Sequence, residues 1–250
     1  MDKKEHFMAI CDETVAASRQ RDTIGRLQEK TLHAALKKYF EPDETRHEIK
    51  IGSYYADAVS GETGEIIEIQ TRAFNRLRNK LTFFLKEHDV LVVYPIPHKK
   101  WITWLDPDTG EIVGKKRLSP KTGSFYQAFP ELYKIKPYLH DPHIHLCILL
   151  VDVIEYKLLN GWSDDKKKGS SRYELIPTAL ADETEIRCIE DYAQFLPADL
   201  PEVFTSKDFK RCMPRGSANL VQPVINILYH VGTIERIGKA GRLYTYKVKH

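Results

Sequence analysis

The chain has 250 residues and a formal net charge of only +3, so charge alone neither requires nor excludes a nucleic-acid partner. With 42% hydrophobic and 29% charged residues, the composition is ordinary for a globular protein and excludes wholesale disorder. The longest apolar stretch, residues 144–154, is interrupted by Asp152 and is too short to span a bilayer. The N-terminus shows no signal-peptide pattern, so we expect a cytoplasmic protein without membrane contact.

The cysteines and histidines give little sign of a zinc site. The four cysteines are isolated from one another and form no Cys-x-x-Cys pair, which argues against a disulfide framework or a zinc knuckle. The segment HDPHIH holds three closely spaced histidines, but no partner ligands stand at a recognised zinc spacing.

The N-terminal part of the chain predicts two helices. Residues 1–22 are polar and predict a loosely attached helical extension. Residues 23–40 place apolar side chains at helical spacing, and Pro42 ends that helix.

Three extended segments follow, and their patterns predict strands over residues 47–51, 54–59 and 65–72. The turn between the second and third contains two glycines, which is typical of a hairpin. A helix over residues 74–87 and a strand over 90–95 come next. The nearly continuous apolar run of that strand suits burial on both faces. The predicted order is therefore α-β-β-β-α-β.

The middle of the chain predicts a second hairpin and another strand. Residues 101–105 and 111–116 flank a turn-forming segment, and residues 146–156 read as a strand. A boundary near residues 177–186 would separate a domain over 23–180 from a smaller one over 185–250.

Two carboxylates in the hairpin of the second and third strands point to chemistry. Side chains alternate along a strand, so Glu68, Gln70 and Arg72 would share one polar surface while Ile67 and Ile69 enter a core. Asp57 lies on the preceding strand and can approach Glu68 across the turn. Adjacent carboxylates repel one another, and a divalent cation such as Mg²⁺ or Mn²⁺ removes that cost.

The order of elements, with Asp57 on the second strand and Glu68-x-Gln70 on the third, resembles the PD-(D/E)XK (restriction endonuclease-like) nuclease superfamily over roughly residues 23–156. The resemblance implies an α+β fold with a mixed sheet flanked by helices. It implies that Asp57 and Glu68 bind the metal and that the residue at the third place, here Gln70, orients the attacking water. Gln70 departs from the lysine usual at that position, and Ala56 departs from the proline. The glutamate that many members carry on the first helix would be Glu29.

These features predict a Mg²⁺-dependent DNA endonuclease, of a restriction or defence kind. The alternative is a catalytically inactive nuclease-fold protein that binds DNA or serves as an assembly partner, and Gln70 motivates it. An enzyme that cuts both strands favours a homodimer, although no residue identifies the interface.

Basic residues near the predicted site could contact DNA phosphates, or could simply form solvated surface. They lie on the helix after the third strand and in two basic loops, and the candidates are Arg72, Arg76, Lys80, Lys116 and Lys167.

The C-terminal segment resembles a winged helix. Ser206 and Ser217 would cap a short and a longer helix, and a hairpin with a Gly-Lys-x-Gly-Arg tip follows. Pro223 would either kink the longer helix or mark its first turn. The alternative role is protein interaction. The residues that the resemblance places at DNA are Arg215, Ser217, Asn219, Gln222, Lys239 and Arg242.

Overall fold

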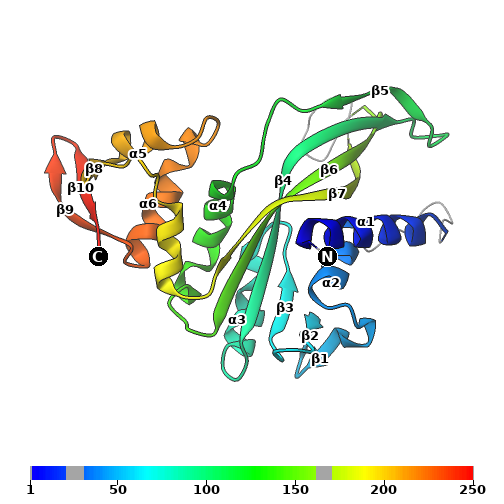
Figure 1. Ribbon diagram of the computed structural model, residues 1–250, viewed down its shortest axis with the longest axis horizontal. Helices are drawn as coiled ribbons and strands as arrows, with labels where there is room; N and C mark the ends of the chain where they lie inside the picture. Colours follow the sequence, from blue (N-terminus) through cyan, green and yellow to red (C-terminus); the bar gives the residue numbers. More distant parts are fainter. Residues whose placement is uncertain (1, 21–30, 162–170, 250) are drawn as a thin grey trace.

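The computed structural model describes residues 2–20, 31–161 and 171–249, and a large mixed sheet forms its centre (Figure 1). The strand order is β1-β2-β3-β4-β6-β7, with β5 paired to β4. β3, β4 and β6 are parallel neighbours, and the remaining pairs are antiparallel. The strands are β1 His47–Ile51, β2 Tyr54–Val59, β3 Ile66–Ile69, β4 Val90–Leu105, β5 Ile112–Leu118, β6 Ile144–Leu158 and β7 Ser171–Ile186.

Helices cover both faces of this sheet, which confirms the expected α+β class (Figure 1). α1 Lys3–Gln20 and α2 Thr31–Phe40 lie on one face, and α3 Arg78–Phe84 and α4 Phe129–Leu132 lie on the other. Short 3₁₀ helices connect these elements: η1 Glu44–Arg46, η2 Phe74–Leu77, η3 Phe125–Ala128, η4 Tyr133–Tyr138, η5 Ile189–Phe195 and η6 Ala218–Leu220.

The N-terminal helix is packed firmly, which corrects the expectation of a loose extension. Phe7 of α1 is fully buried, and its ring meets Tyr39 of α2 edge-on at 5.2 Å between centroids. Cys11 is also buried in the same cluster. Although α1 is mostly polar, the few apolar residues on one side of it pack against β7 and α2 and hold the helix in place.

Two parts of the middle differ from expectation. Residues 101–105 do not form a separate strand but continue β4, and the register with β6 shifts between Pro97 and Lys100. Pairing with β3 ends at Val93, so Pro95 and Pro97 pair with β6 alone, at positions where β4 has lost its β3 neighbour. The predicted hairpin of β4 and β5 is confirmed. Lys116 lies in β5, an exposed strand at the edge of the sheet, rather than in a basic loop.

The C-terminal segment has the helix-helix-hairpin order expected from the sequence. It comprises β8 Val203–Thr205, α5 Ser206–Cys212, α6 Val221–His230, β9 Ile234–Ala240 and β10 Leu243–Val248. Its three strands form a separate small sheet in the order β8-β10-β9.

The caps of these helices correct the predicted ones. Thr205, not Ser206, caps α5, and it forms a capping box with Asp208. Ser217 is 3% exposed and meets Ser124 through the two hydroxyl groups at 2.8 Å, so it is not an exposed DNA-binding candidate. Pro223 stands in the first turn of α6, where the missing N–H costs nothing.

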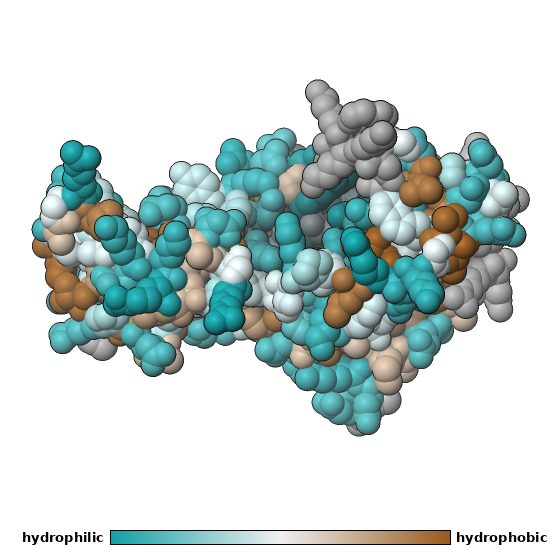
Figure 2. Space-filling view, turned by 90° about the horizontal axis from the view of Figure 1, so that it is seen from above, coloured by the Kyte–Doolittle hydropathy of each residue, from teal (hydrophilic) through white to brown (hydrophobic). Residues whose placement is uncertain are grey.

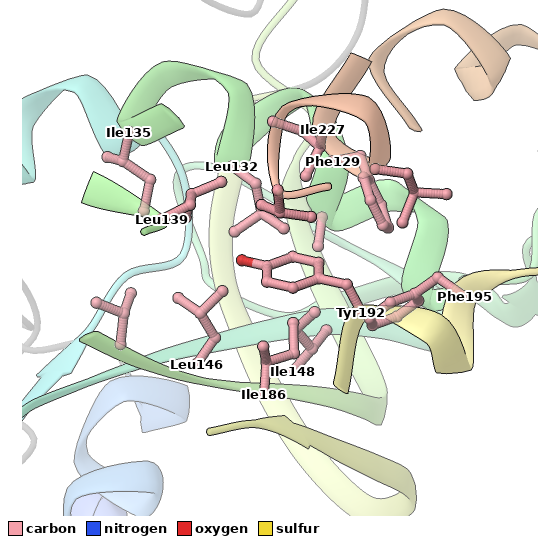
Figure 3. Close-up of a cluster of buried hydrophobic side chains, with 14 of the residues drawn as sticks. Phe129, Leu132, Ile135, Leu139, Leu146, Ile148, Ile186, Tyr192, Phe195 and Ile227 are labelled. Atoms are coloured by element: carbon pink, nitrogen blue, oxygen red, sulfur yellow. The ribbon is translucent and has the colours of Figure 1, made fainter. Parts of the chain in front are cut away.

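One hydrophobic core joins the sheet to the C-terminal segment. Figure 3 shows Ile148 of β6, Tyr192 of η5 and Phe129 of α4 meeting Ile227 of α6 in this cluster. The same cluster continues to Phe204 in the small sheet. The opposite face of the large sheet packs its own core under α1 and α2.

The surface viewed in Figure 2 is mostly hydrophilic, with apolar side chains gathered toward its two ends. The exposed apolar side chains include Ile112 and Leu118 of β5, and Ile237 of β9. Within the described ranges, no helix has the length and apolar character needed to cross a membrane.

Candidate functional site

Asp57 lies where β2 separates from β3. The two strands pair at Ala58 with Ile67 and at Val59 with Ile66. Beyond that point the Asp57 carboxylate, not a backbone carbonyl, accepts the N–H of Ile69, with 2.7 Å between Oδ2 and N. The side chain is thereby fixed against the last residue of β3.

Glu68 is buried, which corrects its predicted place on a polar surface. It is 2% exposed, because α3 and its neighbours cover this face of β3. The ammonium of Lys80 on α3 lies 2.9 Å from both carboxylate oxygens of Glu68. Lys80 also donates to the carbonyl of Tyr55, at 2.7 Å. This lysine was expected to reach outward to DNA and instead is held inside the site.

The two carboxylates differ in their proton affinity. Burial raises the pKa of Glu68 to about 7, and the negative charge of Asp57 adds to this effect, while Lys80 opposes it. Burial would also raise the pKa of Asp57, but the hydrogen bond and charge of His33, the Ile69 N–H and the charge of Lys80 bring it below its usual value. Near neutral pH, Asp57 is therefore ionised while Glu68 is close to its titration midpoint.

His33 is a site residue that sequence reasoning missed. Its Nε2 lies 3.3 Å from Oδ2 of Asp57, and both side chains are mostly buried. His33 stands four residues after Glu29, on the same face of the predicted helix, and this spacing was a usable signal. Glu29 itself lies outside the described residues.

Gln70 and Arg72 lie beyond the end of β3, so strand alternation does not apply to them. The backbone N–H of Gln70 donates to the carbonyl of Val93 at 2.9 Å. Its side-chain amide donates to the carbonyl of Arg72. Both residues line a cavity of about 840 Å³, whose wall also includes His33 and Ile69. The structure thus places Gln70 beside the carboxylate pair but on the wall of a neighbouring cavity.

The remaining predicted DNA-binding residues fall into separate surface groups. Arg76 is exposed on η2, and Lys116 is exposed on β5 with its ammonium 5.1 Å from the centroid of the Trp101 ring. Lys167 lies outside the described residues. In the C-terminal segment, the candidates that are exposed are Arg215, Asn219, Gln222, Lys239 and Arg242. β5 and the small sheet stand at opposite ends of the molecule in Figure 1, so these groups do not form one site.

The Asp57–Glu68 pair suits a hydrated divalent cation. Burial and the charge of Asp57 raise the pKa of Glu68, and a bound cation would oppose both effects. Among the described residues, no cluster of three or more His, Cys, Asp or Glu side chains is arranged to hold a metal. Mg²⁺ keeps several waters and is often held by only one or two carboxylates, which is the kind of donor that Asp57 and Glu68 offer.

Comparison with known proteins identifies the family. Residues 30–187 match a family described as Domain of unknown function (DUF8091). The chain is also similar to a protein of Treponema pallidum (strain Nichols) described as "Uncharacterized protein", with 31% identity over 231 residues, which cover 90% of this chain and 87% of the relative. No solved structure matches the chain. The matched family covers more than half of the sequence and includes Asp57, Glu68 and Lys80, so the chain belongs to the family of the Domain of unknown function (DUF8091).

Proposed function

We propose that the protein is a Mg²⁺- or Mn²⁺-dependent DNA endonuclease of the PD-(D/E)XK kind. The observation that carries the proposal is the meeting of Asp57, Glu68 and Lys80 at the point where β2 and β3 separate. Two carboxylates and one ammonium are the groups that phosphodiester hydrolysis with a divalent cation requires.

The topology around these residues supports the proposal. β1, β2 and β3 form an antiparallel meander, and β4 returns parallel to β3 after η2 and α3. The site therefore lies in the α-β-β-β-α-β arrangement that the superfamily uses, on the strands where that superfamily carries its acidic residues.

Lys80 supplies the positive charge that Gln70 lacks. A glutamine amide is neutral and cannot act as a cationic acid. The Lys80 ammonium reaches the same carboxylate from α3, at 2.9 Å from both oxygens. In the proposed reaction the positive charge of this ammonium, held beside Glu68, favours the negative charge that grows on the phosphate, and the Gln70 amide helps orient the water.

Asp57 and Glu68 would hold the cation, with Asp57 oriented by His33 and the Ile69 N–H. When bound, a divalent cation supplies activation of water and stabilisation of the charge that grows on the phosphate. The water oxygen bonds to phosphorus, the bond between phosphorus and the leaving oxygen breaks, and that oxygen takes up a proton. Arg76 and the basic residues of the C-terminal segment would hold the DNA backbone.

The test is cleavage of plasmid, branched and single-stranded DNA with Mg²⁺ or Mn²⁺. Asp57→Asn and Glu68→Gln keep the side-chain shapes and remove the charges, so each should lower the cleavage rate by at least about a hundredfold. Lys80→Ala should lower it as well, and Lys80→Arg should restore part of the loss.

Glu62→Gln is the matched control, because Glu62 is an exposed acid in the turn of the same hairpin. It should leave cleavage unchanged. Equal activity in the wild type and in both carboxylate variants would refute the site. DNA binding without metal-stimulated cleavage on any substrate would instead support the inactive, DNA-binding alternative.

A further inference from the structure

A cavity of about 840 Å³ opens beside the carboxylate pair. Its wall brings together α2, the segment that follows β3, the middle of β4 and the start of β7. The volume is in the range of about 300–1,000 Å³ that is usual for small-molecule sites. The cavity is thus large enough for an organic ligand.

The cavity and the carboxylate site share residues. His33 lines the cavity and lies 3.3 Å from the Asp57 carboxylate. Ile69 also lines it, and its N–H is bound by the same carboxylate. A ligand in the cavity would therefore contact the two residues, His33 and Ile69, that hold the Asp57 carboxylate.

The walls combine amides with apolar and aromatic surface. Gln70 and Gln127 bring side-chain amides, which can pair with the edges of a nucleobase. Leu32, Leu175 and Tyr94 bring apolar and aromatic surface, against which a base can pack. Burial raises the pKa of Tyr94 to about 12, so its hydroxyl stays protonated and can donate a hydrogen bond.

Of the positively charged side chains that line the cavity within the described ranges, the guanidinium of Arg72 is the one available to bind an anion. Lys37 pairs with Glu48, and Arg172 pairs with Glu155, each at 2.8 Å. Arg72 is exposed and makes no ion pair anywhere in the part of the chain that the structure describes. A guanidinium in this position suits the fork geometry of a phosphate.

We propose that the cavity holds one unstacked nucleotide of the DNA strand to be cut, with its base against Tyr94 and the two glutamines and its phosphate at Arg72. The inference rests on the proposed nuclease function and adds the form of its substrate. A base stacked inside a duplex cannot reach into a concave cavity, so the preferred substrate has an unpaired or easily flipped nucleotide next to the scissile bond.

The first experiment titrates deoxynucleoside 5′-monophosphates into the full chain by calorimetry, with EDTA present so that no divalent cation takes part. At least one nucleotide should bind, and Arg72→Ala should weaken it by about tenfold or more, since a hydrogen bond to a charged group is lost. Arg78→Ala is the matched control, because Arg78 is an exposed arginine at the start of the adjacent α3 that does not line the cavity.

A second variant fills the cavity from its rim. Gln127 is exposed in η3, so Gln127→Trp adds bulk without disturbing a buried site. It should abolish nucleotide binding. If no nucleotide binds, or if binding is unchanged by both Arg72→Ala and Gln127→Trp, the inference is wrong.

The third measurement uses 2-aminopurine at an unpaired position of a DNA oligonucleotide. Wild-type protein should change its fluorescence on binding, because the base leaves its stack, and Gln127→Trp should remove that change. Glu68→Gln should lose cleavage but keep both nucleotide binding and the fluorescence change. Absence of cleavage in the wild type would therefore refute the nuclease function, whereas loss of the cavity effects alone would refute this inference.

Discussion

Glu68 and Lys80 form an ion pair that is costly to keep inside a protein. Glu68 is 2% exposed and Lys80 donates to both of its oxygens. Taking these charges out of water has a large desolvation cost, and such pairs are weak evidence for stability. Asp57 next to them adds a second negative charge, which a fold optimised only for stability would avoid. Perturbed carboxylates of this kind gather at functional sites.

The first prediction concerns the pH dependence of metal binding. Because the pKa of Glu68 is raised to about 7, its carboxyl group gains a proton as the pH falls below that value. A protonated carboxyl binds Mg²⁺ poorly, so the affinity for Mg²⁺ or Mn²⁺ should fall by about tenfold for each pH unit below 7 and level off above it. Calorimetric titration at pH 6, 7 and 8 measures this directly.

The free energy of unfolding without metal should depend on the same titration of Glu68, but it should fall, not rise, as the pH increases. A carboxyl pKa that is higher in the folded state contributes stability at low pH, and this contribution is lost as the pH rises through about 7. Bound metal should compensate for the loss, so Mg²⁺ should raise the melting temperature more at pH 8 than at pH 6. Glu68→Gln is the control and should remove the pH dependence of the metal effect. A metal effect independent of pH in the wild type would contradict the prediction.

At the scale of elements, the link from β3 to η2 sets the geometry of the site. It carries Gln70 and Arg72 and ends in Ala73, whose φ of 59° and ψ of 52° lie in the left-handed region. This conformation costs an alanine about 1–2 kcal/mol, and such strain is found at ligand-binding segments. The left-handed conformation of Ala73 directs the chain from the end of β3 into η2 and then α3, the helix that carries Lys80.

Another prediction tests this turn by chemical denaturation. Ala73→Gly should change the free energy of unfolding by at most about +1 kcal/mol, because relief of strain is offset by the greater freedom of the unfolded chain. Ala73→Val should lower it by about 1–2 kcal/mol, because a β-branched residue is strongly disfavoured at positive φ. Gly64→Ala is the control: Gly64 has a φ of 75° with no atom near an added Cβ, so any loss there measures the backbone conformation alone. Equal stability of the alanine and valine forms at position 73 would contradict the prediction.

Many of the elements were predictable from the sequence, because periodicity and turn residues are local signals, but β7 was not, and the boundary expected near residues 177–186 falls inside it. The hairpin of β2 and β3, the buried run of β4 and the helix-helix-hairpin order of the C-terminal segment all follow from such patterns. The extent of β4 does not, because its prolines indicate a break that pairing with β6 overrides.

The site was predictable only in part. Asp57 and Glu68 can be paired from the hairpin, but the burial of Glu68 depends on α3, which reaches it by tertiary packing. The same packing turns Lys80 inward. Strand alternation predicted one surface for Glu68 and Gln70, yet β3 ends at Ile69, and element ends are the least reliable part of a sequence prediction.

At the scale of the whole molecule, the continuous core decides how the C-terminal segment relates to the site. Phe129 on α4, Ile148 on β6 and Ile227 on α6 belong to one buried cluster (Figure 3). A segment that shares a core with the central sheet has a fixed orientation relative to it. The basic hairpin of β9 and β10 is therefore held at a set place with respect to Asp57 and Glu68, which the proposed binding of DNA by both would require.

The last prediction asks whether this shared core makes the chain unfold as one unit. Ile227 is fully buried, so Ile227→Ala should lower the free energy of unfolding by about 2–5 kcal/mol. All three tryptophans, at positions 101, 104 and 162, precede the C-terminal segment in the sequence, so their fluorescence reports on the rest of the chain. In urea, the unfolding midpoint measured by fluorescence should fall together with the midpoint measured by circular dichroism, because removing the Ile227 side chain destabilises the whole cluster.

Gln222→Ala, an exposed change in the same helix, is the control, and its free energy of unfolding should stay within about 0.5 kcal/mol of the wild type. If Ile227→Ala leaves the fluorescence midpoint in place while circular dichroism shows an early transition, residues 185–250 unfold as the independent domain that the sequence predicts, and the hairpin would reach DNA from a separately folding unit.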